Sequence, residues 1–120
     1  MAGKMWIFVG SDDPPKAFAP FMIGAGAAAM DMQVNMFFSM SGLNIIKKGG
    51  AEKIVLEGAA KTLPEFIDII LESGGKLIAC SAALPIAKCT EKDLIEGIEG
   101  GGVATFVDGC QEADVVLTFA

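Results

Sequence analysis

The sequence predicts an α/β fold, a three-layer α/β/α sandwich in which helices cover both faces of a five-stranded parallel sheet. Short apolar runs rich in β-forming residues recur without polar alternation, which is typical of strands buried on both faces. Segments with helix-start and helix-stop signals separate these runs. The chain has 120 residues, 52% of them hydrophobic, so we expect a single domain over residues 1–120 with one core.

The strands are predicted where the apolar runs lie, at residues 5–9, 33–39, 76–80, 103–106 and 115–119. The helices are predicted at residues 16–31, 45–48, 62–73 and 90–99, with a short helix or turn at 107–112. Residues 49–61 have an irregular composition, apart from a short element near 53–57. Strands that alternate with helices in this way indicate βα units and therefore a parallel sheet.

Capping residues mark the starts of two predicted helices. Thr62 is placed as an N-cap, Pro64 lies in the first turn, and Glu65 occupies the capping-box position. Thr90 opens the helix predicted at 90–99 with a similar pattern. Glycines follow both segments and are expected to end the helices.

The helix at 16–31 is apolar on nearly all sides, so a membrane span has to be considered. Its uncharged run, residues 17–30, is shorter than the ~20 residues that cross a bilayer. Asp12, Asp13 and Asp31 bracket it, and it contains Pro20. A tightly packed buried helix is the better interpretation, and we expect no membrane span.

The charge and composition exclude several classes of function. The chain has nine lysines, no arginine and a net charge of −6, which argues against nucleic-acid binding. It has no histidine, which excludes Cys-His and Ser-His-Asp nucleophiles and histidine-containing metal sites. The GxGxxA pattern at 24–29 lies inside a predicted helix rather than after the first strand. We therefore expect no metal and no cofactor.

The cysteines indicate a reducing environment. There are three of them, and the chain does not start with the layout of a cleavable signal, so we expect a cytoplasmic protein without structural disulfides. Cys80 ends an apolar strand and is followed by small, helix-permissive residues. Ligands and chemistry collect at the carboxyl ends of parallel strands, and a following helix would favour a thiolate there. Pro85 could weaken that helix. The alternative is that Cys80 is a small buried residue, as most free cysteines are.

Polar residues that follow the predicted strands are candidates for a pocket around Cys80. They are Ser11, Asp12, Ser41, Asn44 and Ser81. Solvated turn and cap residues would produce the same pattern. Cys89 is a candidate resolving thiol for Cys80, although the spacing is not CxxC and an ordinary residue of a connection is the better interpretation of Cys89.

Several segments resemble one known family. Residues 77–83 (LIACSAA) resemble the cysteine-bearing strand-to-helix segment of the DsrE/DsrF-like sulfur-relay proteins of the DsrEFH superfamily. Residues 37–48 (FFSMSGLNIIKK) resemble the segment after that family's second strand, and the ending around 93–97, 102–104 and 112–114 is similar too. The resemblance implies a five-stranded parallel α/β/α domain. It also implies a sulfur carrier in which the equivalent of Cys80 accepts sulfane sulfur as a persulfide and passes it to a partner thiol.

Three hypotheses follow for the function. The first is a sulfur carrier, or sulfurtransferase-like protein, that uses Cys80 within a homo-oligomer. Its partners would be sulfur donor and acceptor proteins or small sulfane-sulfur compounds. The second is a thiol-dependent oxidoreductase of the peroxiredoxin type that uses Cys80 with Cys89. The third is a non-catalytic assembly protein that associates through its apolar first helix, because some members of this fold lack the cysteine.

Overall fold

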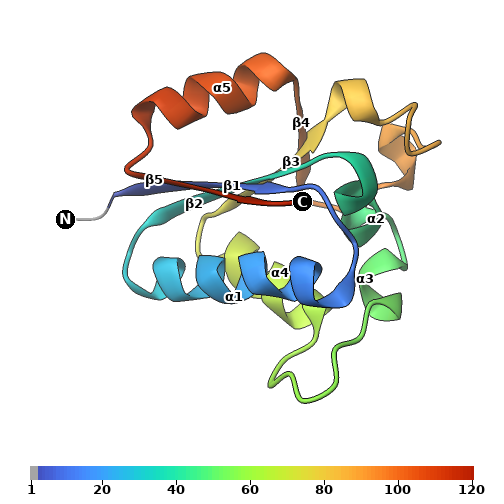
Figure 1. Ribbon diagram of the computed structural model, residues 1–120, viewed down its shortest axis with the longest axis horizontal. Helices are drawn as coiled ribbons and strands as arrows, with labels where there is room; N and C mark the ends of the chain where they lie inside the picture. The colour runs from blue at the N-terminus through green and yellow to red at the C-terminus, as the bar shows by residue number, and fades with distance from the viewer. Residues whose placement is uncertain (1–2) are drawn as a thin grey trace.

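The computed structural model describes residues 3–120 and contains one parallel sheet of five strands in the order β4-β3-β2-β1-β5 (Figure 1). The strands are β1 (Lys4–Val9), β2 (Gln33–Phe38), β3 (Lys76–Cys80), β4 (Ile98–Gly101) and β5 (Val115–Phe119). The predicted fold class is confirmed. Four of the five predicted strands lie within a residue or two of their expected bounds.

Helices cover the two faces of the sheet unequally. The helices are α1 (Pro14–Ala29), α2 (Leu43–Ile46), α3 (Gly50–Lys53), α4 (Leu63–Glu72) and α5 (Val103–Glu112). Helices α1 and α4 pack side by side against one face, and α5 lies on the other (Figure 1). The short helices α2 and α3 lie beyond the carboxyl ends of the strands. Among the described residues, no helix is both long enough and apolar enough to cross a membrane.

The order of the strands explains this layering. From β1 to β4 the chain always steps to the next strand in the same direction, but from β4 to β5 it returns to the opposite edge. Parallel connections are almost always right-handed, so a reversal of direction places the connecting helix on the other face. Helix α5 is this returning connection, and it forms the second layer.

Aromatic rings fill the space on both sides of the sheet. On the α1 side, Phe21 packs against Phe38 of β2 and Phe66 of α4, with ring centroids 5.9 and 6.5 Å apart. On the other side, Phe106 of α5 lies 5.1 Å from Phe37 and 6.0 Å from Trp6. Burial of such large side chains is the main source of stability for both layers.

The helix start predicted at Thr62 is confirmed. The backbone N–H of Glu65 donates to Thr62 Oγ1 at 3.3 Å, and the Thr62 N–H donates to Glu65 Oε1 at 2.9 Å. This reciprocal pair satisfies two backbone donors that the first turn of a helix leaves free. Hydrogen bonding to Thr62 also lowers the pKa of Glu65.

Two predictions around β4 are wrong. The helix expected at 90–99 is a single 3-10 turn, η3 (Glu91–Asp93), and the strand of this region is Ile98–Gly101 rather than 103–106. Ile98 pairs with Leu77 of β3, so contact with a neighbouring strand decides the conformation of a glycine-rich segment. Residues 103–106 begin α5 instead, because Thr105 Oγ1 accepts the Gly102 N–H at 3.1 Å and so caps the helix.

Helix α5 approaches the sheet closely because it carries Gly109. A Cβ atom built on Gly109 would overlap the indole ring of Trp6. Trp6 lies beneath the helix and is 9% exposed. No larger residue fits at this position unless α5 moves away from the sheet.

We predict that Gly109→Ala destabilises the protein by about 1–3 kcal/mol, because overpacking outweighs the better helix propensity of alanine. Urea unfolding followed by circular dichroism measures the change. Gly26→Ala is the matched control, since Gly26 is a helical glycine with nothing within 4 Å of an added Cβ. It should stabilise the protein by about 0.5–1 kcal/mol. Equal effects of the two substitutions would contradict this account of α5.

We also predict that the η3 cap makes stability depend on pH. The hydrogen bond from the Thr90 backbone N–H, with help from Lys47 and Lys48, lowers the pKa of Asp93 from 3.8. A carboxylate with a lowered folded pKa stabilises the protein above its unfolded pKa, and this contribution disappears as the pH falls through the folded value. The wild type should therefore exceed Asp93→Asn in urea midpoint near neutral pH, and the difference should shrink as the pH falls below 3.8 and vanish below the lowered pKa of the folded state. Asp68→Asn, on the exposed side of α4, is the control, and a pH-independent difference for Asp93→Asn would refute the prediction.

Candidate functional site

Cys80 is the last residue of β3, beside the edge strand β4. It pairs in register with Gly101, and Ala79 before it pairs with Phe38 of β2. The predicted location at the carboxyl end of a strand is confirmed. Cys80 is only 3% exposed, whereas Ser81 next to it is exposed. A thiol at this point has the position expected of a working residue and the burial expected of a core residue.

The helix predicted after Cys80 does not form. Only one 3-10 turn follows, η2 (Ser81–Ala83), and irregular turns continue to Lys88. Backbone hydrogen bonds hold these turns. The Ala87 N–H donates to the carbonyl of Ala83 at 2.9 Å, and the Lys88 N–H donates to the carbonyl of Pro85 at 3.1 Å. Pro85 has no N–H with which to continue a helix. The positive helix end that was expected to favour a thiolate at Cys80 is therefore absent.

The structure divides the predicted pocket residues between separate places. Asn44 Nδ2 donates to Asp12 Oδ2 at 2.9 Å, which ties the loop after β1 to α2. Ser11 Oγ accepts the Asp13 N–H at 3.1 Å at the start of α1. Ser41 is exposed within the 3-10 turn η1 (Met40–Gly42). Of these four residues, Ser11 makes a local turn contact, Asp12 and Asn44 join two distant segments, and Ser41 faces solvent.

Three of the polar candidates line cavities, but not the same one. Asp12 and Asn44 line a cavity of about 330 Å³ together with Lys47. Ser81 lines a different and smaller one, of about 80 Å³, with Glu91 and Glu99. The predicted residues therefore do not line one common pocket around Cys80.

Cys89 is buried beside a group of lysines. It is 8% exposed, and its N–H donates to the carbonyl of Leu84 at 3.0 Å. All three cysteines are free, and burial raises the pKa of Cys110 on α5. Among residues 3–120, no three His, Cys, Asp or Glu side chains are grouped so that they could hold a metal ion.

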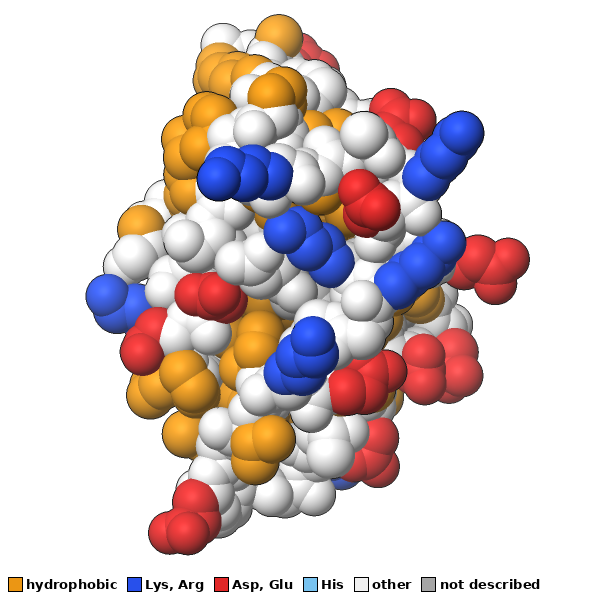
Figure 2. Space-filling model, turned by 90° about the vertical axis from the view of Figure 1, so that its right-hand side faces the viewer, with side chains coloured by type: hydrophobic (Ala, Val, Ile, Leu, Met, Phe, Trp, Pro, Cys, Tyr) orange, Lys and Arg blue, Asp and Glu red, His pale blue; other side chains and the backbone are white. Residues whose placement is uncertain are grey.

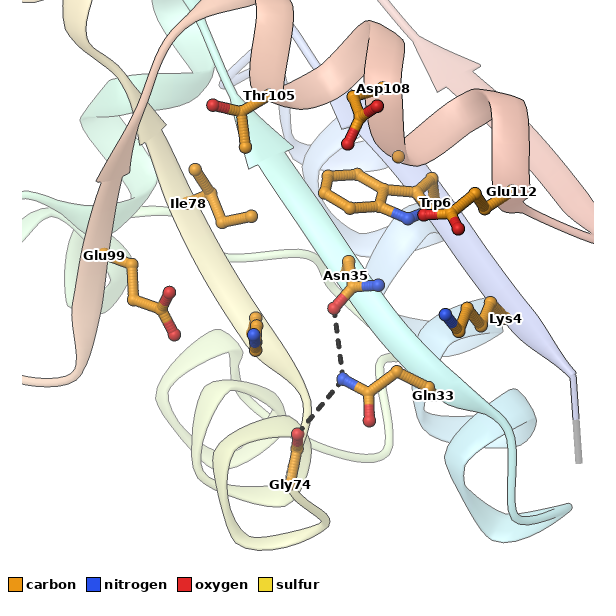
Figure 3. Close-up of a pocket in the computed structure, with 12 residues that line it drawn as sticks. Lys4, Trp6, Gln33, Asn35, Gly74, Ile78, Glu99, Thr105, Asp108 and Glu112 are labelled. Carbon is orange, nitrogen blue, oxygen red and sulfur yellow. Dashed lines mark hydrogen bonds between the residues drawn. The ribbon is translucent and has the colours of Figure 1, made fainter.

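A groove lies beside α5 on the part of the sheet that this helix leaves uncovered (Figure 3). Its volume is about 490 Å³, and Trp6, Asn35 and Ile78 form part of its lining. Gln33 Nε2 donates to Asn35 Oδ1 at 3.1 Å and to the carbonyl of Gly74 at 3.3 Å. The groove reaches Lys76 at the start of β3, about 13 Å along the strand from Cys80 at ~3.3 Å per residue.

Sequence reasoning missed this groove, although β2 carries a signal of it. Gln33 and Asn35 alternate with Val34 and Met36, which is the pattern of a strand with one apolar face and one partly polar face. Gln33 and Asn35 line the groove, although Asn35 is itself only 5% exposed, and Val34 and Met36 are buried in the core.

Comparison with known proteins places the chain in a family. The model of the DsrE/DsrF-like family matches residues 4–119. Uncharacterized protein YrkE of Bacillus subtilis is 30% identical over 145 positions, covering 89% of this chain and 91% of that protein. Sulfur carrier protein DsrE2 of Allochromatium vinosum is 23% identical over 140 positions, covering 84% of this chain and 88% of that protein.

A solved structure supports the same assignment at the level of the fold. MTH1491 from Methanobacterium thermoautotrophicum, a protein of unknown function, superposes with a TM-score of 0.77 at 15% identity. The match covers 96% of this chain and 98% of that one. With a parallel five-stranded sheet, a cysteine at the carboxyl end of β3 and a family match over nearly its whole length, this chain belongs to the DsrE/DsrF-like family.

Proposed function

We propose that this protein is a sulfur carrier that accepts sulfane sulfur as a persulfide on Cys80 and relays it to a partner thiol. The observation that supports the proposal most is the position of a free thiol at the carboxyl end of β3 in a protein of this family. The name of the relative DsrE2, a sulfur carrier protein, supports it further. Ligand sites of open α/β sheets lie at the same edge.

The transfer consists of two thiol exchange steps. The Cys80 thiolate attacks the outer sulfur of a donor persulfide, the sulfur–sulfur bond of the donor breaks, and the donor leaves as a thiolate. A partner thiolate then attacks the outer sulfur of the Cys80 persulfide, and Cys80 is released as a thiolate. Neither step needs an outside oxidant or reductant. The absence of histidine from the sequence is compatible with this chemistry, because the attacking group is the thiolate itself.

Access to Cys80 requires local opening. The thiol is 3% exposed, and the segment from Ser81 to Lys88 that follows it has only a few turn hydrogen bonds. Segments with few buried contacts and few backbone bonds open at the lowest free energy. We therefore assign to this segment the movement that exposes the thiol to donor and acceptor.

Further expectations belong to the same proposal. Residues 1–120 act as one domain in the cytoplasm, where free thiols persist. Identical chains associate, and exposed apolar side chains on α1 and α5 are available for the contact; they include Met22, Ile23, Val103 and Val107. Size-exclusion chromatography with light scattering tests the association.

We predict that incubation with a cysteine desulfurase and cysteine adds about 32 Da, one sulfur atom, to the Cys80 peptide. Peptide mass spectrometry without reductant locates the adduct. Cys80→Ala should remove it and abolish transfer to an acceptor thiol, whereas Cys110→Ala should leave both unchanged.

Two outcomes would contradict this prediction. Sulfur transfer that persists in Cys80→Ala would show that Cys80 is not the carrier. A Cys80–Cys89 disulfide that forms under mild peroxide, without any persulfide from the desulfurase, would instead support a thiol oxidoreductase.

A further inference from the structure

Cys89 and four lysines line a cavity at the carboxyl edge of the sheet. Its volume is about 450 Å³, and its lining is Lys47, Lys48, Lys88, Cys89, Lys92 and Asp93. Figure 2 looks onto this edge of the molecule and shows lysine side chains gathered across the face. The cavity therefore combines Cys89, which is 8% exposed, with four lysines.

Two distant segments of the chain form this cavity and are joined by hydrogen bonds. Lys47 and Leu94 form an isolated antiparallel bridge, and the Lys48 N–H donates to the carbonyl of Asp93 at 2.8 Å. Lys47 Nζ donates to the carbonyl of Ala87 at 3.0 Å. The backbone contacts therefore hold the two lysine-bearing segments side by side, and the Lys47 side chain is bonded to the connection that precedes Cys89.

The charge of the cavity is opposite to that of the molecule. The protein has a net charge of −6, but four of its nine lysines line this cavity, opposed there by the carboxylate of Asp93. That carboxylate already accepts the Thr90 N–H at 2.8 Å. Clefts lined by one sign of charge concentrate ligands of the opposite sign. The preferred ligand is an anion.

We propose that this cavity binds a small sulfur oxyanion of the thiosulfate class and that Cys89 accepts its outer sulfur. The Cys89 thiolate attacks the outer sulfur, the sulfur–sulfur bond of thiosulfate breaks, and sulfite leaves with the bonding electron pair. Cys89 is left as a persulfide, and no other oxidant or reductant is consumed. Both reactants are anions that repel each other, so four nearby ammonium groups favour their encounter and stabilise the charge of the departing sulfite.

This inference deepens the proposed function by naming a substrate class. It rests on that function only for the later passage of sulfur to a carrier, because loading of Cys89 needs no Cys80. The two claims therefore fail separately. Loss of desulfurase-dependent loading of Cys80 refutes the first, and loss of thiosulfate-dependent loading of Cys89 refutes the second.

The test uses the full chain, with thiosulfate as the probe at low ionic strength. We expect sulfite release and a persulfide on the Cys89 peptide, both retained in Cys80→Ala and lost in Cys89→Ser. Lys48→Gln/Lys92→Gln should slow both by about tenfold, since it removes two of the four charges and leaves the Lys47 bond to Ala87 intact. Lys61→Gln/Lys76→Gln removes the same charge elsewhere and should change nothing. Added salt should slow the wild type more than the Lys48/Lys92 variant.

Alkylation separates anion recognition from mere exposure of the thiol. Iodoacetate is an anion and iodoacetamide is neutral, so the ratio of their rates at Cys89 reports the local potential. Cys110, partly buried on α5, serves as the internal reference within the same protein. The ratio at Cys89 should exceed that at Cys110 and fall in Lys48→Gln/Lys92→Gln. The proposal is overturned if thiosulfate leaves Cys89 unmodified, or if the lysine substitutions alter neither the sulfite release nor the ratio.

Discussion

The second layer of this protein depends on the close contact between Gly109 of α5 and the indole of Trp6. The chain returns from β4 at one edge to β5 at the other, and α5 is the helix that makes this crossing. Without a side chain at Gly109, the helix approaches the sheet closely enough for Phe106 to reach Phe37. One helix is narrower than a sheet of five strands, so α5 covers only part of this face. The groove around Asn35 lies on the part that stays uncovered.

Sequence reasoning succeeded where a local signal agreed with tertiary packing. The buried strands are uninterrupted apolar runs, and the capping box at Thr62 places α4 to within a residue. It failed at β4, where Gly100 and Gly101 carry no hydrophobic pattern and pairing with β3 decides the conformation. It also failed after Cys80, where Pro85 leaves irregular turns in place of a helix. The lysine-lined cavity was out of reach, because Lys47 and Lys92 come together only through the fold.

The source of positive charge in the candidate site differs from what the sequence suggested. A helix end would have provided fixed backbone dipoles at Cys80, but the structure has only a 3-10 turn there. Positive charge is instead provided by lysine side chains around Cys89, farther along the same connection. Side-chain charges respond to salt and to substitution more readily than backbone dipoles do. The positive charge at this edge can therefore be changed by salt or by lysine substitutions, without changing the fold.

If Cys80 carries sulfur as we propose, its burial has a consequence for the lifetime of the persulfide. Persulfides are destroyed by the small thiols of a reducing compartment, which attack the same outer sulfur as an acceptor does. A sulfur held on a side chain that is 3% exposed is shielded from such attack while the connection after β3 stays closed. Discharge to competing thiols is then reduced to the small fraction of time for which the connection is open. A protein built in this way would act as a store whose contents are released when a partner opens it.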